Sequence, residues 1–184
     1  MPERNIIHRP TINHPFRVQS NQAKAVLTSS NRYASLEQVV AAGDTARVRQ
    51  TENVFPIAER VLHEMVDHCQ KELPYEACGL LSGGNGRAVT IWKMENADKS
   101  LFSFSMKEEQ ILSVFTQMEK RGEQLVAIYH SHPTAPAYPS PYDIEFANYP
   151  EAAYLILSLA GEQPEIGCFR ITGKQVTLLH LAIC

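Results

Sequence analysis

Two histidines and an aspartate in the stretch Tyr129–Asp143 carry the clearest chemistry of this sequence. His130 and His132 are one residue apart, and Asp143 follows after a proline-rich interval. Two imidazoles and one carboxylate form a three-ligand set that leaves one position of a tetrahedral zinc ion open for water, as in catalytic rather than structural zinc sites. The types and spacing of these residues therefore predict a catalytic zinc site.

The surrounding sequence predicts elements that would bring the three side chains together. The apolar run Leu125–Tyr129 is typical of a buried strand that ends at the histidines. Residues i and i+2 of a strand point to the same side, so His130 and His132 can face one ion. The pair Ser140–Pro141 indicates a helix N-cap followed by the first helical residue, which places Asp143 in the first turn. Such a helix would turn the carboxylate back over the end of the strand.

Each of these residues also has a purely structural interpretation. Histidines separated by one residue occur in loops and as hydrogen-bonded core residues, so the pair alone does not decide between a metal site and packing. Ser140 can serve as a helix N-cap and nothing more, or it can combine that role with a catalytic one. The presence of the histidine pair, Ser140 and Asp143 together favours the metal site.

The segment His130–Asp143 resembles the zinc signature of the JAMM (MPN-plus) metallopeptidases. It reads His-Ser-His-Pro, then Ser140 after a seven-residue gap, then Asp143 after two more residues. The family pattern also requires a glutamate on an upstream strand, and Glu76 in the segment Pro74–Leu81 matches it. The resemblance covers about residues 56–182. It implies an α/β fold, a mixed β-sheet flanked by helices, with the layering that JAMM/MPN domains share with cytidine deaminases.

Carried over residue by residue, the resemblance assigns a role to each matched side chain. His130, His132 and Asp143 would bind Zn²⁺, Glu76 would move the proton, and Ser140 would hydrogen-bond the developing oxyanion. Without the zinc signature, Glu76 would be interpreted as a surface carboxylate that follows a helix-breaking proline. With it, a catalytic glutamate at the start of a buried strand is the better interpretation.

The resemblance also bears on the substrate. Members of the family cleave after the Gly-Gly tail of ubiquitin-like proteins, and the compact spacing here resembles bacterial members that process sulfur-carrier proteins. We therefore expect a zinc-dependent peptidase or isopeptidase with a ubiquitin-like or ThiS/MoaD-like protein substrate. Two alternatives stay open: a catalytically silent scaffold or binding module of the same fold, and a JAMM peptidase that acts on a cell-wall or phage-tail substrate.

Other zinc motifs and cysteine motifs do not match. Zinc deaminases need a Pro-Cys-x-x-Cys motif, which is absent. His63 and His68 are one residue too far apart for a His-Glu-x-x-His protease, and both are predicted to be surface or boundary residues. The four cysteines lack Cys-x-x-Cys spacing, so packing residues or free thiols are expected, with Cys78 in the core and Cys184 exposed.

Composition and charge argue against several protein classes. The formal net charge is -3, whereas a general nucleic-acid binder is usually basic. No apolar run is long enough for a membrane span, and the N-terminus lacks the apolar core of a signal peptide. We expect a cytoplasmic protein that binds neither nucleic acid nor membrane, and the oligomeric state is left open.

The chain divides into two parts by composition. Residues 1–52 are polar, with an excess of Lys and Arg, and are interpreted as a flexible or loosely docked N-terminal extension. A segment that covers the domain or binds a partner is the alternative. Residues 53–184 are predicted to form the JAMM/MPN metallopeptidase domain.

Hydrophobic periodicity and turn residues predict the remaining elements. A helix is expected over residues 56–72, with Pro56 in its first turn. A capping box over residues 105–108 is expected to open a second helix that Gly122 ends. The expected strands cover residues 77–82 and 88–94 as a hairpin, then 101–105, 125–130, 153–159, 166–171 and 176–181.

Overall fold

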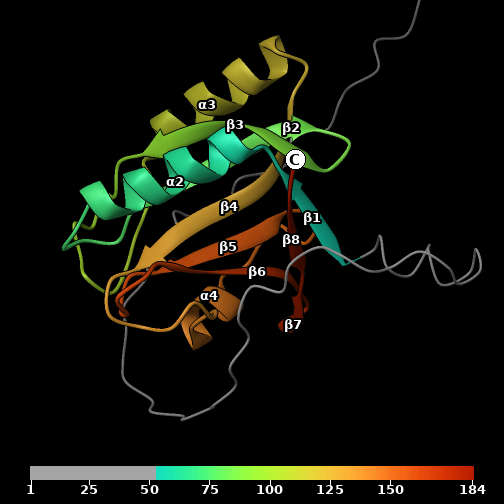
Figure 1. The fold of residues 1–184 in the computed structure, drawn as a ribbon. Coiled ribbons are helices and arrows are strands. Elements are labelled where there is room, and N and C mark those ends of the chain that lie inside the picture. Colours follow the sequence, from blue (N-terminus) through green and yellow to red (C-terminus); the bar gives the residue numbers. More distant parts are fainter. Residues whose placement is uncertain (1–52) are drawn as a thin grey trace, which may run out of the picture.

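The computed structural model describes residues 53–184, which form one eight-stranded mixed sheet flanked by helices (Figure 1). The prediction for residues 1–52 lies outside the described residues. The strand order is β7-β6-β5-β4-β2-β3-β1-β8. The strands are β1 (Val54–Ile57), β2 (Cys78–Gly84), β3 (Arg87–Met94), β4 (Gln124–His132), β5 (Ala153–Ser158), β6 (Glu165–Thr172), β7 (Gln175–Leu178) and β8 (His180–Ile183). The helices are α2 (Glu59–Lys71), α3 (Glu108–Lys120) and α4 (Pro141–Glu145). The predicted fold class is confirmed.

The sheet separates two hydrophobic cores, because successive side chains of a strand point to opposite faces. In β2, Leu81 packs into the core under α2, while Leu80 packs into the core under α3. In β4, Tyr129 packs into the core under α2, while Ile128 packs into the core under α3. Each fully buried Leu or Ile contributes about 1.5–3 kcal/mol to stability. The middle of the sheet is therefore a rigid base for side chains at the strand ends.

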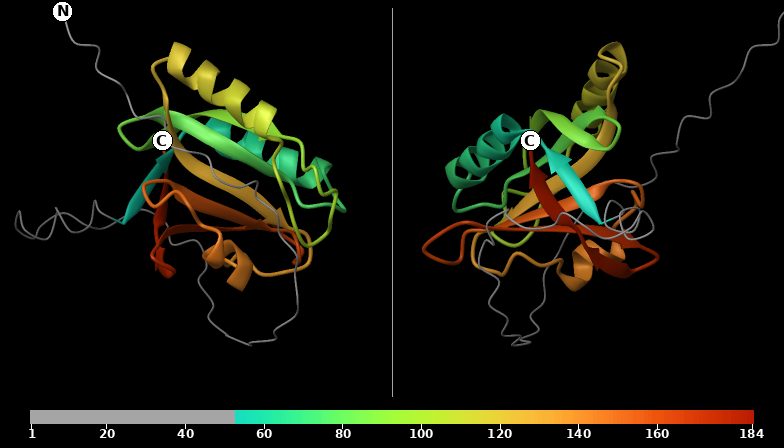
Figure 2. Two further views of the ribbon diagram at one scale, coloured as in Figure 1. Left: turned by 180° about the vertical axis from the view of Figure 1, so that it is seen from behind. Right: turned by 45° about the vertical axis from the view of Figure 1, so that its right-hand side comes forward.

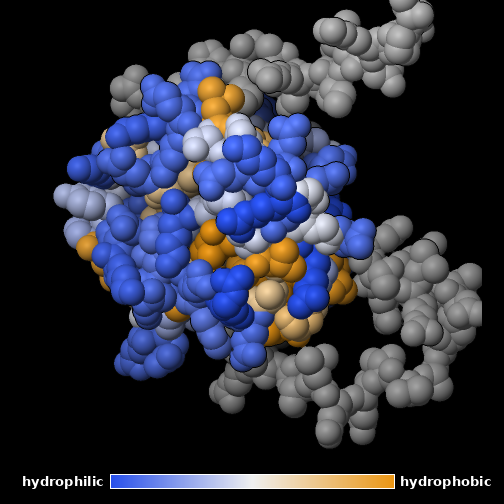
Figure 3. Space-filling model, turned by 90° about the horizontal axis from the view of Figure 1, so that it is seen from above, coloured by the Kyte–Doolittle hydropathy of each residue, from blue (hydrophilic) through white to orange (hydrophobic). Residues whose placement is uncertain are grey.

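The two longer helices cover opposite faces of the sheet. Helix α2 buries Val61, Met65 and Cys69 in one core, and α3 buries Ile111 and Met118 in the other. Seen from the side of α3, the surface is mainly hydrophilic, with hydrophobic residues gathered in one area (Figure 3). No helix of residues 53–184 is long and apolar enough to cross a membrane.

The hairpin β2–β3 and the neighbouring β4 bring the start of β2 beside the end of β4. The hairpin turns at Asn85 and Gly86, which both have positive φ values of 53° and 73°, as two-residue hairpin turns require. Strand β2 also pairs antiparallel with β4, so Cys78 lies opposite His130. The residues that precede Cys78 in the chain therefore lie next to the histidines, as the two halves of the sequence signature require.

The sheet curls so that its two edges come near each other (Figure 2). Strands β7 and β8 occupy opposite ends of the strand order, yet only Leu179 separates them in the chain. The backbone N–H of Leu179 donates to the carbonyl of Cys168 at 2.8 Å, and its side chain is buried. The single strand predicted over residues 176–181 is thus wrong: β7 pairs with β6, and β8 pairs with β1.

Three other local predictions are wrong because tertiary contacts override the local sequence. Pro56 lies in β1, which pairs with β8, and the helix begins only at Glu59. Residues 101–105 are an irregular loop rather than a strand. Ser105 is not a cap, because its hydroxyl donates to Asp98 and the N-cap of α3 is Lys107. Gly122 follows the end of α3 with a φ of 66°, as predicted.

Candidate active site

His130 and His132 lie at the C-terminal end of β4, the central strand next to β2. Their side chains are buried, and their Nε2 atoms are 3.0 Å apart. Two nitrogens that bind one tetrahedral zinc ion at about 2.0–2.1 Å are about 3.3 Å apart. The spacing of the two imidazoles thus suits a shared ion.

Asp143 reaches the same place from the first turn of α4. Ser140 is the N-cap: its hydroxyl accepts from the Asp143 N–H at 3.1 Å, and the Ser140 N–H donates to Asp143 Oδ2 at 2.7 Å. This capping box directs the carboxylate toward β4. Asp143 Oδ1 lies 3.5 Å from His130 Nε2, and Oδ2 lies 3.7 Å from His132 Nε2. The predicted convergence of the three residues is therefore present.

The surroundings of the histidines leave their Nε2 atoms available to a ligand. His132 Nδ1 is 2.8 Å from the Pro136 carbonyl oxygen, which can only accept a hydrogen bond. Nδ1 therefore donates to this carbonyl, and Nε2 is the nitrogen that faces His130 and Asp143, as in metal-binding histidines. The His130 ring stacks on Phe104, with centroids 4.8 Å apart. The loop after His132 is held by the Ser158 hydroxyl, which donates to the Ala135 carbonyl.

The donor set of His130, His132 and Asp143 fits a divalent ion. Their ligand atoms all lie within 4.8 Å of one another. Burial alone would raise the pKa of Asp143, but the charge of His130 and hydrogen bonds from His130, His132 and Ser140 outweigh burial and lower it. Asp143 is thus held as a carboxylate, the form that binds a metal.

Glu76 is a buried carboxyl group whose pKa is raised, unlike that of Asp143. Burial raises its pKa to about 9, and the negative charges of Asp143 and Asp98 add to the increase. Only 5% of Glu76 is exposed, so the surface interpretation from the local sequence does not apply. Without a nearby cation, Glu76 holds its proton at neutral pH.

The backbone around Glu76 is fixed by three hydrogen bonds that the sequence did not indicate. The Glu76 N–H donates to the Ser100 carbonyl, and the Glu76 carbonyl accepts from Asn96 Nδ2, both at 2.9 Å. The Ala77 N–H donates to the hydroxyl of Ser131, the residue between the two histidines, at 2.8 Å. No pattern in the sequence marks Asn96. Ser131 lies between the two histidines of the motif, and this position was the only indication in the sequence that its hydroxyl lies near the site.

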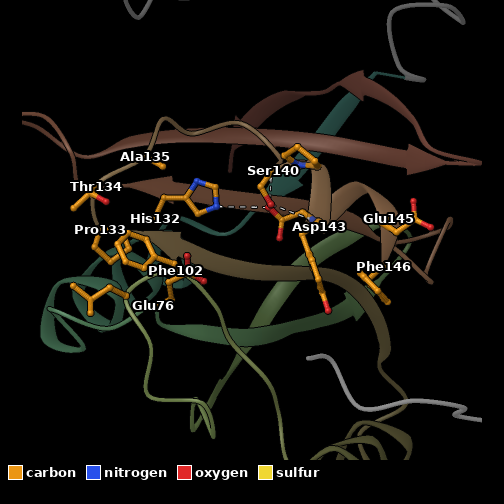
Figure 4. Close-up of a pocket in the computed structure, with 13 residues that line it drawn as sticks. Glu76, Phe102, His132, Pro133, Thr134, Ala135, Ser140, Asp143, Glu145 and Phe146 are labelled. Atoms are coloured by element: carbon orange, nitrogen blue, oxygen red, sulfur yellow. Dashed lines mark hydrogen bonds and ion pairs between the residues drawn. The ribbon is translucent and has the colours of Figure 1, made fainter. Parts of the chain in front are cut away.

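Glu76, His132, Ser140 and Asp143 line one groove of about 400 Å³ (Figure 4). In the close-up, His132, Ser140 and Asp143 are directed toward one another. Leu101 and Phe102 also line the groove, from the loop before α3, and Phe146 lines it from the end of α4. The rest of the lining consists of Pro133, Thr134, Ala135, Pro141, Tyr142 and Glu145. A concave site with a few polar groups of this kind is typical of a ligand-binding site.

The remaining sequence candidates do not line this groove. His63 is exposed, as expected. His68 is instead buried, and its Nδ1 is 2.8 Å from the Tyr129 hydroxyl, so it is a hydrogen-bonded core residue. Cys78 is buried and Cys184 is exposed, as predicted.

The family of the chain follows from its match to known proteins. Residues 58–172 match the family described as "Prokaryotic homologs of the JAB domain". The chain belongs to this prokaryotic JAB family. It is the JAMM/MPN family that the sequence resembles, so that prediction is confirmed. The matched region contains Glu76, His130, His132, Ser140 and Asp143.

Relatives of this JAB domain protein have names that specify substrates. The protein named CysO-cysteine peptidase of Mycobacterium tuberculosis is 35% identical over 127 residues, which cover 67% of this chain and 87% of that protein. The desampylase of Haloferax volcanii is 35% identical over 113 residues, which cover 60% of this chain and 79% of that protein. Among solved structures, a protein from Desulfitobacterium hafniense is 34% identical with a TM-score of 0.64, over 70% of this chain and 92% of that chain.

Proposed function

We propose that this prokaryotic JAB protein is a zinc-dependent peptidase or isopeptidase that cleaves after the Gly-Gly tail of a ubiquitin-like sulfur-carrier protein. The observation that carries the proposal is the convergence of His130, His132 and Asp143 beside a groove that the buried Glu76 also lines. The names of the relatives support the substrate class, since they are called a CysO-cysteine peptidase, a desampylase and a probable TtuB-protein conjugate cleaving protease.

Zinc is the ion that this donor set favours. Two imidazoles and one carboxylate, with no sulfur and few oxygens, are typical of catalytic zinc sites with an open position. His130, His132 and Asp143 would hold the ion. When bound, zinc would polarise the scissile carbonyl and make water acidic enough to lose a proton near neutral pH.

Glu76 is proposed as the group that moves the proton. Its buried carboxyl group lines the groove but does not belong to the converging set of three ligands. A neighbouring cation would lower the raised pKa of Glu76, so the carboxylate could accept a proton from the attacking water. The protonated Glu76 could then donate to the leaving nitrogen of the peptide or isopeptide.

Ser140 is proposed to stabilise the oxyanion that develops on the scissile carbonyl. Its hydroxyl oxygen accepts from the Asp143 N–H, and its hydroxyl hydrogen, which bonds to the Asp143 side chain, could turn to donate to a substrate carbonyl. Ser140 also lines the groove, so a carbonyl bound beside Asp143 would lie within its reach. The N-cap role that the structure shows is therefore compatible with the proposed catalytic role.

The direct test combines the zinc-loaded protein with a Gly-Gly-ended sulfur-carrier protein that has a C-terminal cysteine or short peptide. Mass spectrometry is expected to show release of the extension after the second glycine. A zinc-loaded protein that leaves every such carrier intact would contradict the proposed substrate. Cleavage of a cell-wall peptide instead would support the alternative peptidase.

Glu76→Gln is expected to lower kcat for this cleavage by about 10²–10⁴-fold, because it removes general acid–base catalysis. Zinc content, measured by inductively coupled plasma mass spectrometry, should stay at the wild-type value. Glu151→Gln is a matched control, since Glu151 is exposed, and it should keep wild-type turnover. Undiminished cleavage by Glu76→Gln would refute the role given to this residue.

A further inference from the structure

The loop between β3 and α3, residues 95–107, contacts several parts of the groove at once. It is irregular in structure, yet Asn96, Ser103, Phe104 and Ser105 in it are buried. Buried irregular backbone needs hydrogen-bond partners for its polar groups. The hydrogen bonds to these backbone groups show which side chain stabilises the loop.

The side chain of Asn96 makes four hydrogen bonds to backbone groups, three of them within the loop. Its Nδ2 atom donates to the carbonyls of Glu76 and Ser103, both at 2.9 Å. Its Oδ1 atom accepts from the N–H groups of Asp98 at 3.0 Å and Ser105 at 3.2 Å. A primary amide has two N–H donors and an oxygen with two lone pairs, so the Asn96 side chain is fully used.

The loop is tied to the groove at more than one point. The Glu76 N–H donates to the loop carbonyl of Ser100, so both backbone groups of Glu76 are bound to the loop. Phe104 of the loop stacks on the ring of His130. At the tip, Leu101 and Phe102 are 40% and 54% exposed and line the groove. The loop therefore connects Glu76, the imidazole of His130 and the wall of the groove.

We propose that Asn96 is a positioning residue for the reaction: it clamps the 95–107 loop onto the backbone of Glu76 and so fixes the direction of the Glu76 carboxylate. The kinetic part of this inference rests on the proposed function. Asn96 does not line the groove, so it acts through Glu76 rather than on the substrate.

The physical reason is the steep dependence of proton transfer on geometry. A misplacement of about 1 Å can lower the rate about 10²-fold. Asn96→Asp keeps the size of the side chain and the two acceptor bonds, but it replaces both donors by an oxygen. Two carbonyl oxygens, those of Glu76 and Ser103, would then face an acceptor instead of a donor. The loop would separate from Glu76 while the rest of the sheet stays intact.

The experiment compares the zinc-loaded full chain as wild type, Asn96→Asp and Gln110→Ala in carrier cleavage. Gln110 is the matched control, because its amide oxygen accepts from the Glu95 N–H of the same loop at 3.2 Å without contacting Glu76. Asn96→Asp is expected to lower kcat by about 30- to 100-fold, with KM within about threefold and zinc content unchanged. Gln110→Ala should stay within about twofold of wild type in both constants.

A second measurement does not depend on the substrate. Amide hydrogen exchange by NMR should show that the Glu76 N–H exchanges at least about tenfold faster in Asn96→Asp than in wild type, and unchanged in Gln110→Ala. If the wild type cleaves no carrier, the proposed function fails, but this exchange comparison still decides whether the clamp exists. Unchanged exchange would then overturn it.

A purely structural role for Asn96 would give a different result. In that case Asn96→Asp would lower the melting temperature, while kcat measured well below that temperature would equal the wild-type value, and the positioning role would be overturned. If Asn96→Asp does not fold, Asn96→Ser takes its place, since serine adds no buried charge and its shorter side chain, with one donor, cannot bridge the carbonyls of Glu76 and Ser103. The same loss of kcat is expected from it.

Discussion

Glu76 and Asp143 are two buried carboxyl groups in one groove whose pKa values move in opposite directions. Burial dominates at Glu76 and raises its pKa to about 9. At Asp143, His130, His132 and Ser140 supply positive charge and hydrogen bonds that outweigh burial, so its pKa is lowered. Two carboxyl groups whose surroundings separate their pKa values in this way can serve as an acid–base group and a fixed anion.

The raised pKa of Glu76 predicts how stability depends on pH in the metal-free protein. Between the unfolded value of about 4.3 and the folded value of about 9, the folded state binds more protons than the unfolded state. Stability contributed by this group therefore falls as the pH rises through that range. Each pH unit in this range is worth about 1.4 kcal/mol, so metal-free Glu76→Gln should be more stable than metal-free wild type by about 5 kcal/mol at pH 8, and equal to it near pH 4.

Urea unfolding in the presence of a chelator, at pH 4, 6 and 8, measures this difference. Asp143 is present in both proteins, so its own pH dependence cancels in the comparison. A difference that stays constant with pH, or that grows toward acid pH, would contradict the assignment of the raised pKa to Glu76.

The convergence of His130, His132 and Asp143 predicts that a substitution of one of them weakens metal binding. Asp143→Asn keeps an oxygen that can accept from the Ser140 N–H, but it removes the negative charge from the ligand set. Changes to groups outside the ligand set typically cost about 10–100-fold in metal affinity, so loss of a ligand is expected to cost more than about 100-fold. Competition with a chromophoric chelator measures the affinity. Asp67→Asn changes an exposed aspartate on α2 and should leave the affinity unchanged.

Among the elements, the pairing of β2 with β4 decides where the chemical groups lie. Cys78 is opposite His130 and Gly79 is opposite Tyr129, so Glu76 is carried to the end of the strand that holds the histidines. Tyr129 crosses the space above Gly79 to reach His68 with its hydroxyl. A side chain at residue 79 would have to share this space.

Gly79→Ala is therefore expected to destabilise the β2–β4 pair. A Cβ atom at Gly79 would lie 2.3 Å from the Tyr129 ring, and overpacking of this kind costs about 1–3 kcal/mol. Gly84→Ala in the same strand is the control, because a Cβ atom there meets nothing within 4 Å. Chemical denaturation of the two variants measures the difference. Equal stabilities would show that Tyr129 can move aside at little cost.

At the scale of the whole molecule, residues 53–184 contain the eight-stranded sheet, both cores and the groove lining that the structure describes. A chain that begins at Asn53 is therefore expected to fold and to cleave the carrier with kcat and KM within about twofold of the full chain. Circular dichroism, size-exclusion chromatography and carrier cleavage test this. A large loss of activity or a change in oligomer size would support a working role for residues 1–52.

The chemistry of this protein is visible in short, local patterns. The spacing of His130 and His132 on a strand and the Ser140–Pro141 helix start both depend only on neighbouring residues, so their placement was predictable. The hairpin turn at Asn85 and Gly86 and the helix stop at Gly122 depend on local backbone conformation in the same way. The fold class follows from the alternation of such elements.

Contacts between distant residues decided the rest. Pro56 and β8 took their structure from the pairing of β1 with β8, which joins residues far apart in the chain, while β7 took its structure from pairing with β6. Ser105 does not cap α3, because its hydroxyl donates to Asp98. The side chain of Asn96 supports Glu76 by donating to its carbonyl, twenty residues away in the chain. A buried amide binds whichever backbone groups the fold places around it, and no spacing rule in one sequence can list those groups in advance.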